Sequence, residues 1–176
     1  MQHADHVNLL KGGIPTAGGV WADLGSGPGA FTLALADLLG PGGEIYSVDR
    51  SGSALREQQL AMERRFPDSK VHYLNQDFNQ PLALPALDGV VMANSLHFQR
   101  DKQHTLKLIR GYLKPGGRFI LVEYQTDRGN PWVPYPLSMS TWKDLAGKAG
   151  FTFTRWQASV PSSFLGEIYS ALSLAP

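Results

Sequence analysis

A glycine-rich stretch near the start of the chain has the residue types and spacing of a ligand-binding turn. Three glycines, Gly25, Gly27 and Gly29, follow directly after an apolar run that predicts a buried strand. Glycine lets the backbone turn sharply and approach a ligand closely at the carboxyl end of a strand. Pro28 precedes an apolar helix, where its fixed φ suits the first turn. The stretch therefore predicts one wall of a pocket for a nucleotide or nucleoside.

The glycine pattern alone leaves the ligand open. Gly25-x-Gly27-x-x-Ala30 fits the fingerprint of dinucleotide sites with alanine in the third place, a weak match because short glycine patterns occur by chance. A tight turn without a ligand is the other alternative, but three glycines cost more chain entropy than such a turn requires. Asp23, just inside the predicted strand, would be costly to bury without a partner.

Two acidic residues follow later strands. Asp49 ends the second predicted strand, 24 residues beyond Gly25, where a carboxylate can accept both hydroxyls of a ribose. Sites for NAD use an acid at the same place, so Asp49 indicates a ribose without selecting the cofactor. A cap for the following helix is the alternative. Asp77 follows the third predicted strand and is either a ligand contact or a solvated turn residue.

The end of the fourth predicted strand carries Asn94, Ser95 and His97. Imidazole transfers protons near neutral pH, so His97 is the candidate general base or acceptor-positioning residue. A histidine that only packs at the rim of the sheet is the alternative. His3 and His6 have the spacing of helical metal ligands, but nothing in the sequence completes a site, so no metal is expected.

Together these residues resemble the motifs of the class I S-adenosylmethionine-dependent methyltransferases. The spacing Asp23-x-Gly25-x-Gly27-x-Gly29 is similar to the first motif of that family, and Gln76-Asp77-Phe78 is similar to the third. The resemblance runs from about residue 20 to the C-terminus. It implies S-adenosylmethionine as the cofactor and methyl transfer as the reaction.

In that family, the acid matching Asp23 helps to hold the glycine loop and the ammonium end of the cofactor, and the acid matching Asp77 accepts from the adenine amino group. The backbone at Gly25 and the carbonyl near Asn94 are expected to bind the amino-acid moiety. Arg50 departs from the pattern, because the family usually has an aliphatic residue or methionine there; its guanidinium either stacks on the purine or points to solvent. The cofactor-binding residues implied by the resemblance are Asp23, Gly25, Ser26, Gly27, Gly29, Asp49, Arg50, Asp77, Phe78 and Asn94.

The elements that must position these residues alternate between strands and helices, which is typical of βαβ units and a mostly parallel sheet. The predicted helices are 4–11, 30–39, 53–66, 101–113 and 140–149. The predicted strands are 20–24, 44–48, 71–74, 87–93, 118–123, 151–156 and 167–174. The loop 157–166 between the last two strands is too short for a crossover helix, so this pair is expected to be antiparallel.

The resemblance implies a doubly wound α/β fold: a mostly parallel seven-stranded sheet with helices on both faces, in the order 3-2-1-4-5-7-6 with the last strand antiparallel. The order reverses between the first and fourth strands, and ligands bind over the carboxyl ends at such a point. One domain is expected over 1–176. It is divided into an N-terminal segment over the active site (1–19), a cofactor-binding half (20–124) and an acceptor-side half (125–176).

Composition narrows the class of protein. The 176 residues are 43% hydrophobic and 18% charged, as expected for one globular domain, and the net charge of +1 gives no argument for a nucleic-acid or anionic membrane partner. Cysteine, an apolar run of membrane-spanning length and a secretory signal pattern are all absent. We therefore expect a cytoplasmic protein, as a monomer or a homodimer, without disulfides or thiolate metal sites.

The methyl acceptor is expected to be a small molecule. Methyltransferases that act on adenine, cytosine or glutamine resemble one another in an Asn/Asp-Pro-Pro-Tyr motif, and Asn94-Ser95-Leu96-His97 takes its place here. An NAD(P)-dependent reductase is one alternative, although the Tyr-x-x-x-Lys pair of small reductases is absent; a cofactor-binding module without turnover is another. The acceptor wall is expected from 1–19, 125–137 and 157–166, where aromatic side chains favour an apolar or ring-bearing molecule: Tyr124, Trp132, Tyr135 and Phe164.

Overall fold

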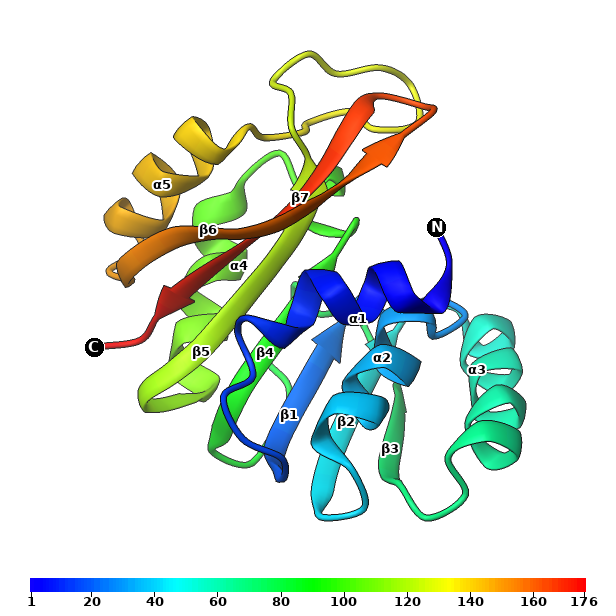
Figure 1. The fold of residues 1–176 in the computed structure, drawn as a ribbon. Helices are drawn as coiled ribbons and strands as arrows, with labels where there is room; N and C mark the ends of the chain where they lie inside the picture. Colours follow the sequence, from blue (N-terminus) through cyan, green and yellow to red (C-terminus); the bar gives the residue numbers. More distant parts are fainter.

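Apolar strands that alternate with helices give this chain three layers, a central sheet with helices on each side (Figure 1). The computed structural model describes residues 1–176. Its strands are β1 (Gly19–Leu24), β2 (Gly43–Asp49), β3 (Lys70–Asn75), β4 (Leu87–Ala93), β5 (Leu113–Tyr124), β6 (Thr152–Ser162) and β7 (Gly166–Leu174). Its helices are α1 (His3–Lys11), α2 (Ala30–Leu39), α3 (Gly52–Arg65), the short 3-10 helix η1 (Leu96–Phe98), α4 (Lys102–Tyr112) and α5 (Met139–Lys148).

The seven strands form one sheet in the order β3-β2-β1-β4-β5-β7-β6. The pairs among β1 to β5 are parallel, whereas β7 is antiparallel to both of its neighbours, β5 and β6. This confirms the predicted order and the antiparallel last strand. Because the chain order reverses between β1 and β4, the connections after these two strands diverge and leave room for a ligand over their carboxyl ends.

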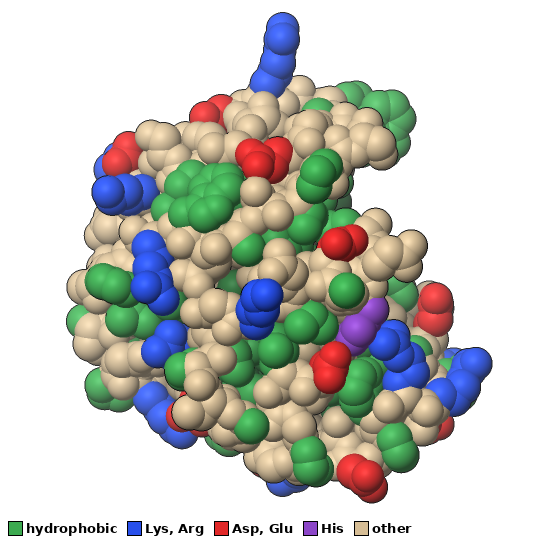
Figure 2. Space-filling view, in the orientation of Figure 1, with side chains coloured by type: hydrophobic (Ala, Val, Ile, Leu, Met, Phe, Trp, Pro, Cys, Tyr) green, Lys and Arg blue, Asp and Glu red, His purple; other side chains and the backbone are tan.

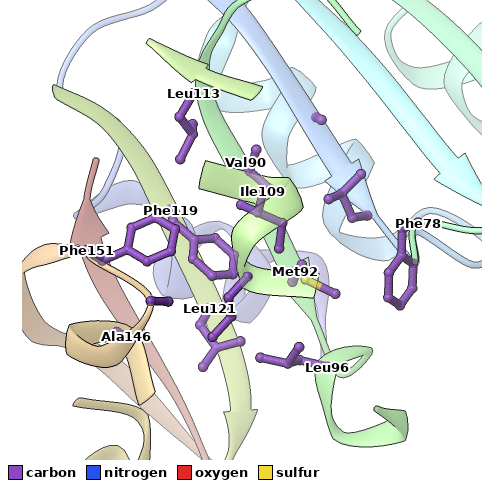
Figure 3. Close-up of a cluster of buried hydrophobic side chains, with 14 of the residues drawn as sticks. Phe78, Val90, Met92, Leu96, Ile109, Leu113, Phe119, Leu121, Ala146 and Phe151 are labelled. Atoms are coloured by element: carbon purple, nitrogen blue, oxygen red, sulfur yellow. The ribbon is translucent and has the colours of Figure 1, made fainter. Parts of the chain in front are cut away.

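Helices α1, α2 and α3 cover one face of the sheet, and α4 and α5 cover the other (Figure 1). On the second face, side chains from β4, β5 and α4 meet, among them Ile109 and Phe119 (Figure 3). Trp142 of α5 packs edge-on against the Phe119 ring, with 5.3 Å between ring centroids. The apolar runs of β4 and β5 are thus buried on both faces, and this core fixes the ends of the two strands.

Two local predictions differ from the structure. The prediction of a loop over 157–166 is wrong, because β6 continues to Ser162 in register with β7 and leaves only a short turn. β6 is an edge strand with few buried residues, so it lacks a strong apolar pattern, and Pro161 is tolerated at such an edge. β5 also begins earlier than predicted, since Leu113 already pairs with Leu87 of β4 before an irregular stretch.

The N-terminal helix α1 packs on α2 and on strands β6 and β7. Its Leu9 and Leu10 are fully buried, and His6 lies against Phe31 of α2 with 4.7 Å between ring centroids. Neither α1 nor any other helix combines the length and the apolar character that crossing a lipid bilayer requires.

Candidate functional site

A crevice of about 280 Å³ opens at the carboxyl ends of β1, β2 and β4, where the strand order reverses. Seven of the ten residues predicted to bind a cofactor line it, and Asp49 and Asp77 border the same space rather than opposite edges of the sheet. The lining residues are Gly25, Gly27, Asp49, Arg50, Asp77, Phe78, Asn94, Ser95, Phe98 and Gln99.

The glycine loop after β1 is built from positive φ angles that glycine adopts easily. Gly25, Gly27 and Gly29 have φ angles of 79°, 53° and 92°. A Cβ atom at Gly25 would come within 2.5 Å of the Cβ of Ser95, whereas one at Gly27 would meet nothing within 4 Å. Gly25 is therefore needed for the close packing of the β1 and β4 ends, and Gly27 faces open space.

Asp49 ties the end of β2 to the glycine loop. Its Oδ2 accepts from the backbone N–H of Gly27 and its Oδ1 from that of Ser51, each at 2.8 Å. The cap of α3 is Ser51 itself, whose Oγ accepts from the backbone N–H of Ala54 at 3.2 Å. Each carboxylate oxygen retains a lone pair, and the side chain borders the crevice. Asp49 is thus placed to orient the loop and to accept from ligand hydroxyl groups.

Asp77 and Phe78 form the adjoining wall. Oδ1 of Asp77 accepts from the backbone N–H of Asn79 at 2.9 Å, and its Oδ2 lies 3.8 Å from Nη1 of Arg50. Asp77 therefore closes a turn and still borders the crevice. The Phe78 ring belongs to the hydrophobic core and also reaches the glycine loop, where its Cε1 lies 3.2 Å from the position of a Cβ on Gly25. The Arg50 side chain is 75% exposed, so solvent competes for this long ion pair.

Asn94, which lines the crevice, has an unpaired buried acceptor. It follows β4 with a positive φ of 51°, and its Oδ1 is buried without a hydrogen-bond partner in the chain. This conformation is uncommon for a residue other than glycine, and an orphaned buried acceptor is costly, so both features point to a donor supplied by a ligand. The neighbouring Ser95 is satisfied within the protein, because its Oγ donates to the carbonyl of Leu24 at 2.8 Å.

Three residues predicted to bind the cofactor, Asp23, Ser26 and Gly29, lie behind the loop and do not line the crevice. Asp23 is almost fully buried, and its Oδ2 accepts from the hydroxyl of Thr32 at 2.7 Å. Burial raises the pKa of Asp23 to about 7; the Thr32 hydroxyl opposes this shift, and the negative charge of Asp49 adds to it. In the structure these residues support the glycine loop from behind. Their contact with the cofactor stays a prediction.

His97 is buried beside the crevice and paired with Glu123, an acid that the sequence patterns did not single out. Nδ1 of His97 lies 2.7 Å from Oε2 of Glu123, and the backbone N–H of His97 donates to Oε1 at 3.0 Å. A carboxylate that accepts from Nδ1–H fixes the tautomer in which Nε2 is the basic nitrogen. Glu123 is fully buried near the end of β5. The sequence did contain a signal for Glu123, since this acid directly follows a run of apolar strand residues. An acid buried at such a position requires a partner.

A buried lysine lies close to this pair. Lys102, at the start of α4, donates from Nζ to the carbonyl of Gln99 at 2.9 Å, and its ammonium lies 5.6 Å from the centre of the Tyr135 ring. Burial lowers the pKa of Lys102, and the negative charge of Glu123 opposes this shift. The backbone N–H of Tyr135 donates to the carbonyl of His97 at 3.0 Å, so the loop that follows β5 is anchored to the same group.

Aromatic rings continue from His97 toward the surface. The centroid of the His97 ring lies 4.3 Å from that of Phe98 and 6.2 Å from that of Tyr124. Phe164, in the β6–β7 turn, lies 6.0 Å from Tyr124 and 6.3 Å from Trp132. Figure 2 shows the molecule hollowed between the β6–β7 turn and the N-terminal end of α1. Since Phe98, Trp132 and Phe164 are each at least half exposed, an apolar surface adjoins the crevice.

The N-terminal segment contributes less than predicted. No residue of 1–19 lines the crevice, and 15–19 border a separate cleft at the opposite, amino-terminal ends of the strands. His3 pairs with Asp37 at 3.0 Å, and His6 packs on α2, so neither lies in the crevice.

Comparison with known proteins gives one consistent family. The family model described as a methyltransferase domain matches residues 16–156. The ubiquinone/menaquinone biosynthesis C-methyltransferase UbiE of Pasteurella multocida is 30% identical over 103 residues, which are 58% of this chain and 38% of that protein. A demethylmenaquinone methyltransferase of a Geobacillus species is 31% identical over 102 residues, which are 57% of this chain and 43% of that protein. The matched part of the chain thus spans less than half the length of each relative.

Among solved structures, a SAM dependent methyltransferase from Aquifex aeolicus superposes with a TM-score of 0.71. The superposition covers 92% of this chain and 84% of that one at 19% sequence identity. At this level of identity the likeness establishes the fold, including the order of the sheet.

Proposed function

Because the chain belongs to the class I S-adenosylmethionine-dependent methyltransferases, we propose that it transfers the methyl group of S-adenosylmethionine to a small, apolar, ring-bearing acceptor. The observation that carries this proposal is the buried His97–Glu123 pair, whose imidazole packs against Phe98, a residue that lines the crevice, and lies 6.2 Å from the ring of Tyr124. A positioned base at this place is what an acceptor that holds its proton tightly needs.

The residues present fit the cofactor. The unpaired Oδ1 of Asn94 is an acceptor suited to the ammonium group of S-adenosylmethionine. Asp49 has lone pairs left for the ribose hydroxyls beside the open space of the glycine loop. Asp77 offers an acceptor for the adenine amino group, and Phe78 offers an apolar wall for the purine ring. The guanidinium of Arg50 is proposed to cover the purine from the solvent side.

When bound, S-adenosylmethionine supplies a methyl group that is already activated for displacement. The chain then has to align the acceptor and remove its proton, and alignment alone is worth about 7–11 kcal/mol of the barrier. We propose that Nε2 of His97 takes the proton of the acceptor, while Glu123 holds Nδ1–H and balances the charge of the resulting imidazolium. Phe98 packs on the His97 ring and limits the access of water to it.

The surroundings of His97 favour an apolar acceptor with a ring. Tyr124, Trp132 and Phe164 form a cluster of aromatic rings that continues from His97 toward the surface. A net charge of +1 gives little attraction for a phosphate backbone, which argues against a nucleic-acid acceptor. Of the two relatives described above, one is named for ubiquinone and menaquinone biosynthesis and the other for demethylmenaquinone. Quinones are ring-bearing molecules, which supports the same class of acceptor here.

Binding and turnover separate the proposal from its alternatives. Calorimetric titrations with S-adenosylhomocysteine, NAD and NADP are expected to show binding of the first compound only. Incubation with methyl-labelled S-adenosylmethionine and a panel of phenols, naphthols and quinols is expected to yield a labelled product. A preference for NAD(P) would contradict the proposal, and cofactor binding without transfer to any compound would favour a module without turnover.

His97→Gln tests the proposed base. The variant is expected to lower turnover by about 10²–10⁴-fold and to leave the affinity for S-adenosylhomocysteine unchanged. His104→Gln is the matched control, since His104 is exposed on α4 and its Nε2 contacts only the carbonyl of Asn79. Unaltered turnover in the His97 variant would reduce His97 to a packing role.

A further inference from the structure

A chain of buried polar side chains connects the glycine loop with Asp23. Thr32 of α2 donates to Oδ2 of Asp23 at 2.7 Å, and Nε2 of Gln58 in α3 donates to the hydroxyl oxygen of Thr32. Ser47 of β2 donates to Oε1 of Gln58 at 2.7 Å, and its Oγ lies at the same distance from Oγ of Ser26 in the loop. All five side chains are buried, and none of them lines the crevice.

The donors along this chain point toward Asp23. The carbonyl oxygen of Gln58 can only accept, and Ser47, which has a single proton, is in donor geometry toward both this oxygen and Oγ of Ser26. Nε2 of Gln58 donates to the hydroxyl oxygen of Thr32. The hydroxyl proton of Thr32 is therefore donated to Asp23. An inverted Gln58 amide would instead offer Thr32 a second acceptor in competition with the carboxylate. The orientation of Gln58 therefore decides where the Thr32 proton goes.

Gln58 also supports the loop from behind. A Cβ atom at Gly29 would come within 2.3 Å of Cγ of Gln58, so the two residues lie in direct contact between α3 and the loop. Gln58 is fully buried, whereas the next residue of the same helix, Gln59, is exposed and donates to Glu63. A fully buried amide requires partners for both its donor and its acceptor, and Thr32 and Ser47 provide them.

We propose that Gln58 is a positioning residue of the cofactor site: it directs the Thr32 hydroxyl to Asp23 and so favours the negatively charged form of Asp23 beneath the glycine loop, where the cationic end of S-adenosylmethionine binds. This inference rests on the proposed cofactor site. Asp23 does not need to touch the cofactor, because a buried charge acts across the weakly screening interior of a protein.

The surroundings of Asp23 make its charge depend on this chain. Burial raises the pKa of Asp23 to about 7, and the one charged group that acts on it, Asp49, raises it as well. The Thr32 hydroxyl is the group that opposes these effects. Thr32 of α2 donates to Asp23, and Ser47 of β2 and Val91 of β4 are level with it in the sheet. Asp49 at the end of β2 is the charged group that acts on it.

The first test needs no cofactor. The pKa of the Asp23 carboxyl group is measured by carbon-13 NMR in the wild type, in Gln58→Leu and in Thr32→Val, which keeps the shape of the side chain. We expect the pKa to rise by about one unit or more in both variants, because a hydrogen bond to the charged form is lost or misdirected. Gln59→Leu is the matched control on the same helix, and we expect no change there. Circular dichroism confirms that each variant is folded.

The second test measures the affinity for S-adenosylhomocysteine by calorimetry between about pH 6 and pH 9. Affinity is expected to rise with pH as Asp23 ionises, and the midpoint of this rise is expected to move to higher pH in Gln58→Leu and Thr32→Val but not in Gln59→Leu. An unchanged pKa of Asp23 in both chain variants would overturn the proposal, as would a raised pKa with an unmoved affinity profile. Failure of the wild type to bind S-adenosylhomocysteine would instead contradict the proposed function, and the NMR result would still decide whether Gln58 controls Asp23.

Discussion

Gly29→Ala is expected to destabilise the protein through two separable effects, strain in the backbone and a clash behind the loop. Gly29 has a φ of 92° and a ψ of 19° at the N-cap of α2, a conformation that costs a residue with a side chain about 1–2 kcal/mol. The new Cβ atom would also lie 2.3 Å from Cγ of Gln58, and overpacking of an interior costs about 1–3 kcal/mol. The sum, about 2–5 kcal/mol, is a large share of the stability of an ordinary domain.

The second effect can be removed by changing the partner. Gln58→Ala deletes the atoms that the new Cβ would meet, so in that background Gly29→Ala retains only the backbone strain of about 1–2 kcal/mol. A double-mutant cycle is therefore expected to give a coupling of about 1–3 kcal/mol, with the double variant more stable than the sum of the two single changes. Urea unfolding followed by far-ultraviolet circular dichroism measures the free energy of unfolding of the four proteins.

Gly27→Ala is the matched control for this cycle. Gly27 also has a positive φ, of 53°, but a Cβ there meets nothing within 4 Å. It is expected to show strain alone and no coupling to Gln58→Ala. If instead Gly29→Ala and Gln58→Ala are additive to within about 0.5 kcal/mol, the contact between Gln58 and the loop is refuted.

Three further substitutions test the site. Asp49→Ala is expected to weaken the binding of S-adenosylhomocysteine by about 1.5–3 kcal/mol, the scale of hydrogen bonds to a charged group, and an unchanged affinity in calorimetry would remove Asp49 from the cofactor site. Glu123→Gln removes the charge that faces the ring of His97, so turnover is expected to fall while the KM for the cofactor stays the same. If the variant and the wild type have equal turnover at every pH, Glu123 has only a structural role. Between pH 3.8 and about 7, Asp23 retains a proton in the folded protein that it has lost in the unfolded chain. Over this pH range the free energy of unfolding of the wild type is therefore expected to fall relative to that of Asp23→Asn as pH rises, by at most about 4 kcal/mol. Parallel curves of unfolding free energy against pH for the two proteins would contradict this.

Much of the crevice was predictable because it depends on local chain geometry and on one property of parallel sheets. Gly25 and Gly27 lie where the chain turns with positive φ angles, and the spacing of glycines in the sequence is enough to reveal such a turn. Asp49 and Asp77 follow different strands, but parallel neighbours end at the same edge of the sheet, so the two acids were expected to meet. The strand order was predicted from the resemblance to a family rather than from the residues themselves.

The residues that the sequence did not reveal depend on contacts between distant segments. Glu123 lies 26 positions from His97, and the pair forms only because β4 and β5 are neighbours whose ends are level. Gln58 looks like an ordinary polar residue of a polar helix until α3 packs against the glycine loop. The length of β6 was missed for the opposite reason, since an edge strand makes few of the buried contacts that give a strand its apolar pattern.

The two buried acids stand on either side of β4, with Asp23 on β1 and Glu123 on β5. Each has one directed side-chain partner, the Thr32 hydroxyl for Asp23 and Nδ1 of His97 for Glu123, because a buried carboxylate without a partner would not stay charged. Above about pH 7, a cationic cofactor on the β1 side would find the negative charge of Asp23 beneath it, and the proposed imidazolium of His97 would find that of Glu123. Asp23→Asn is therefore expected to change the affinity for the cofactor and Glu123→Gln the rate of turnover, and their effects on the free energy of unfolding should add, since the two acids share no partner.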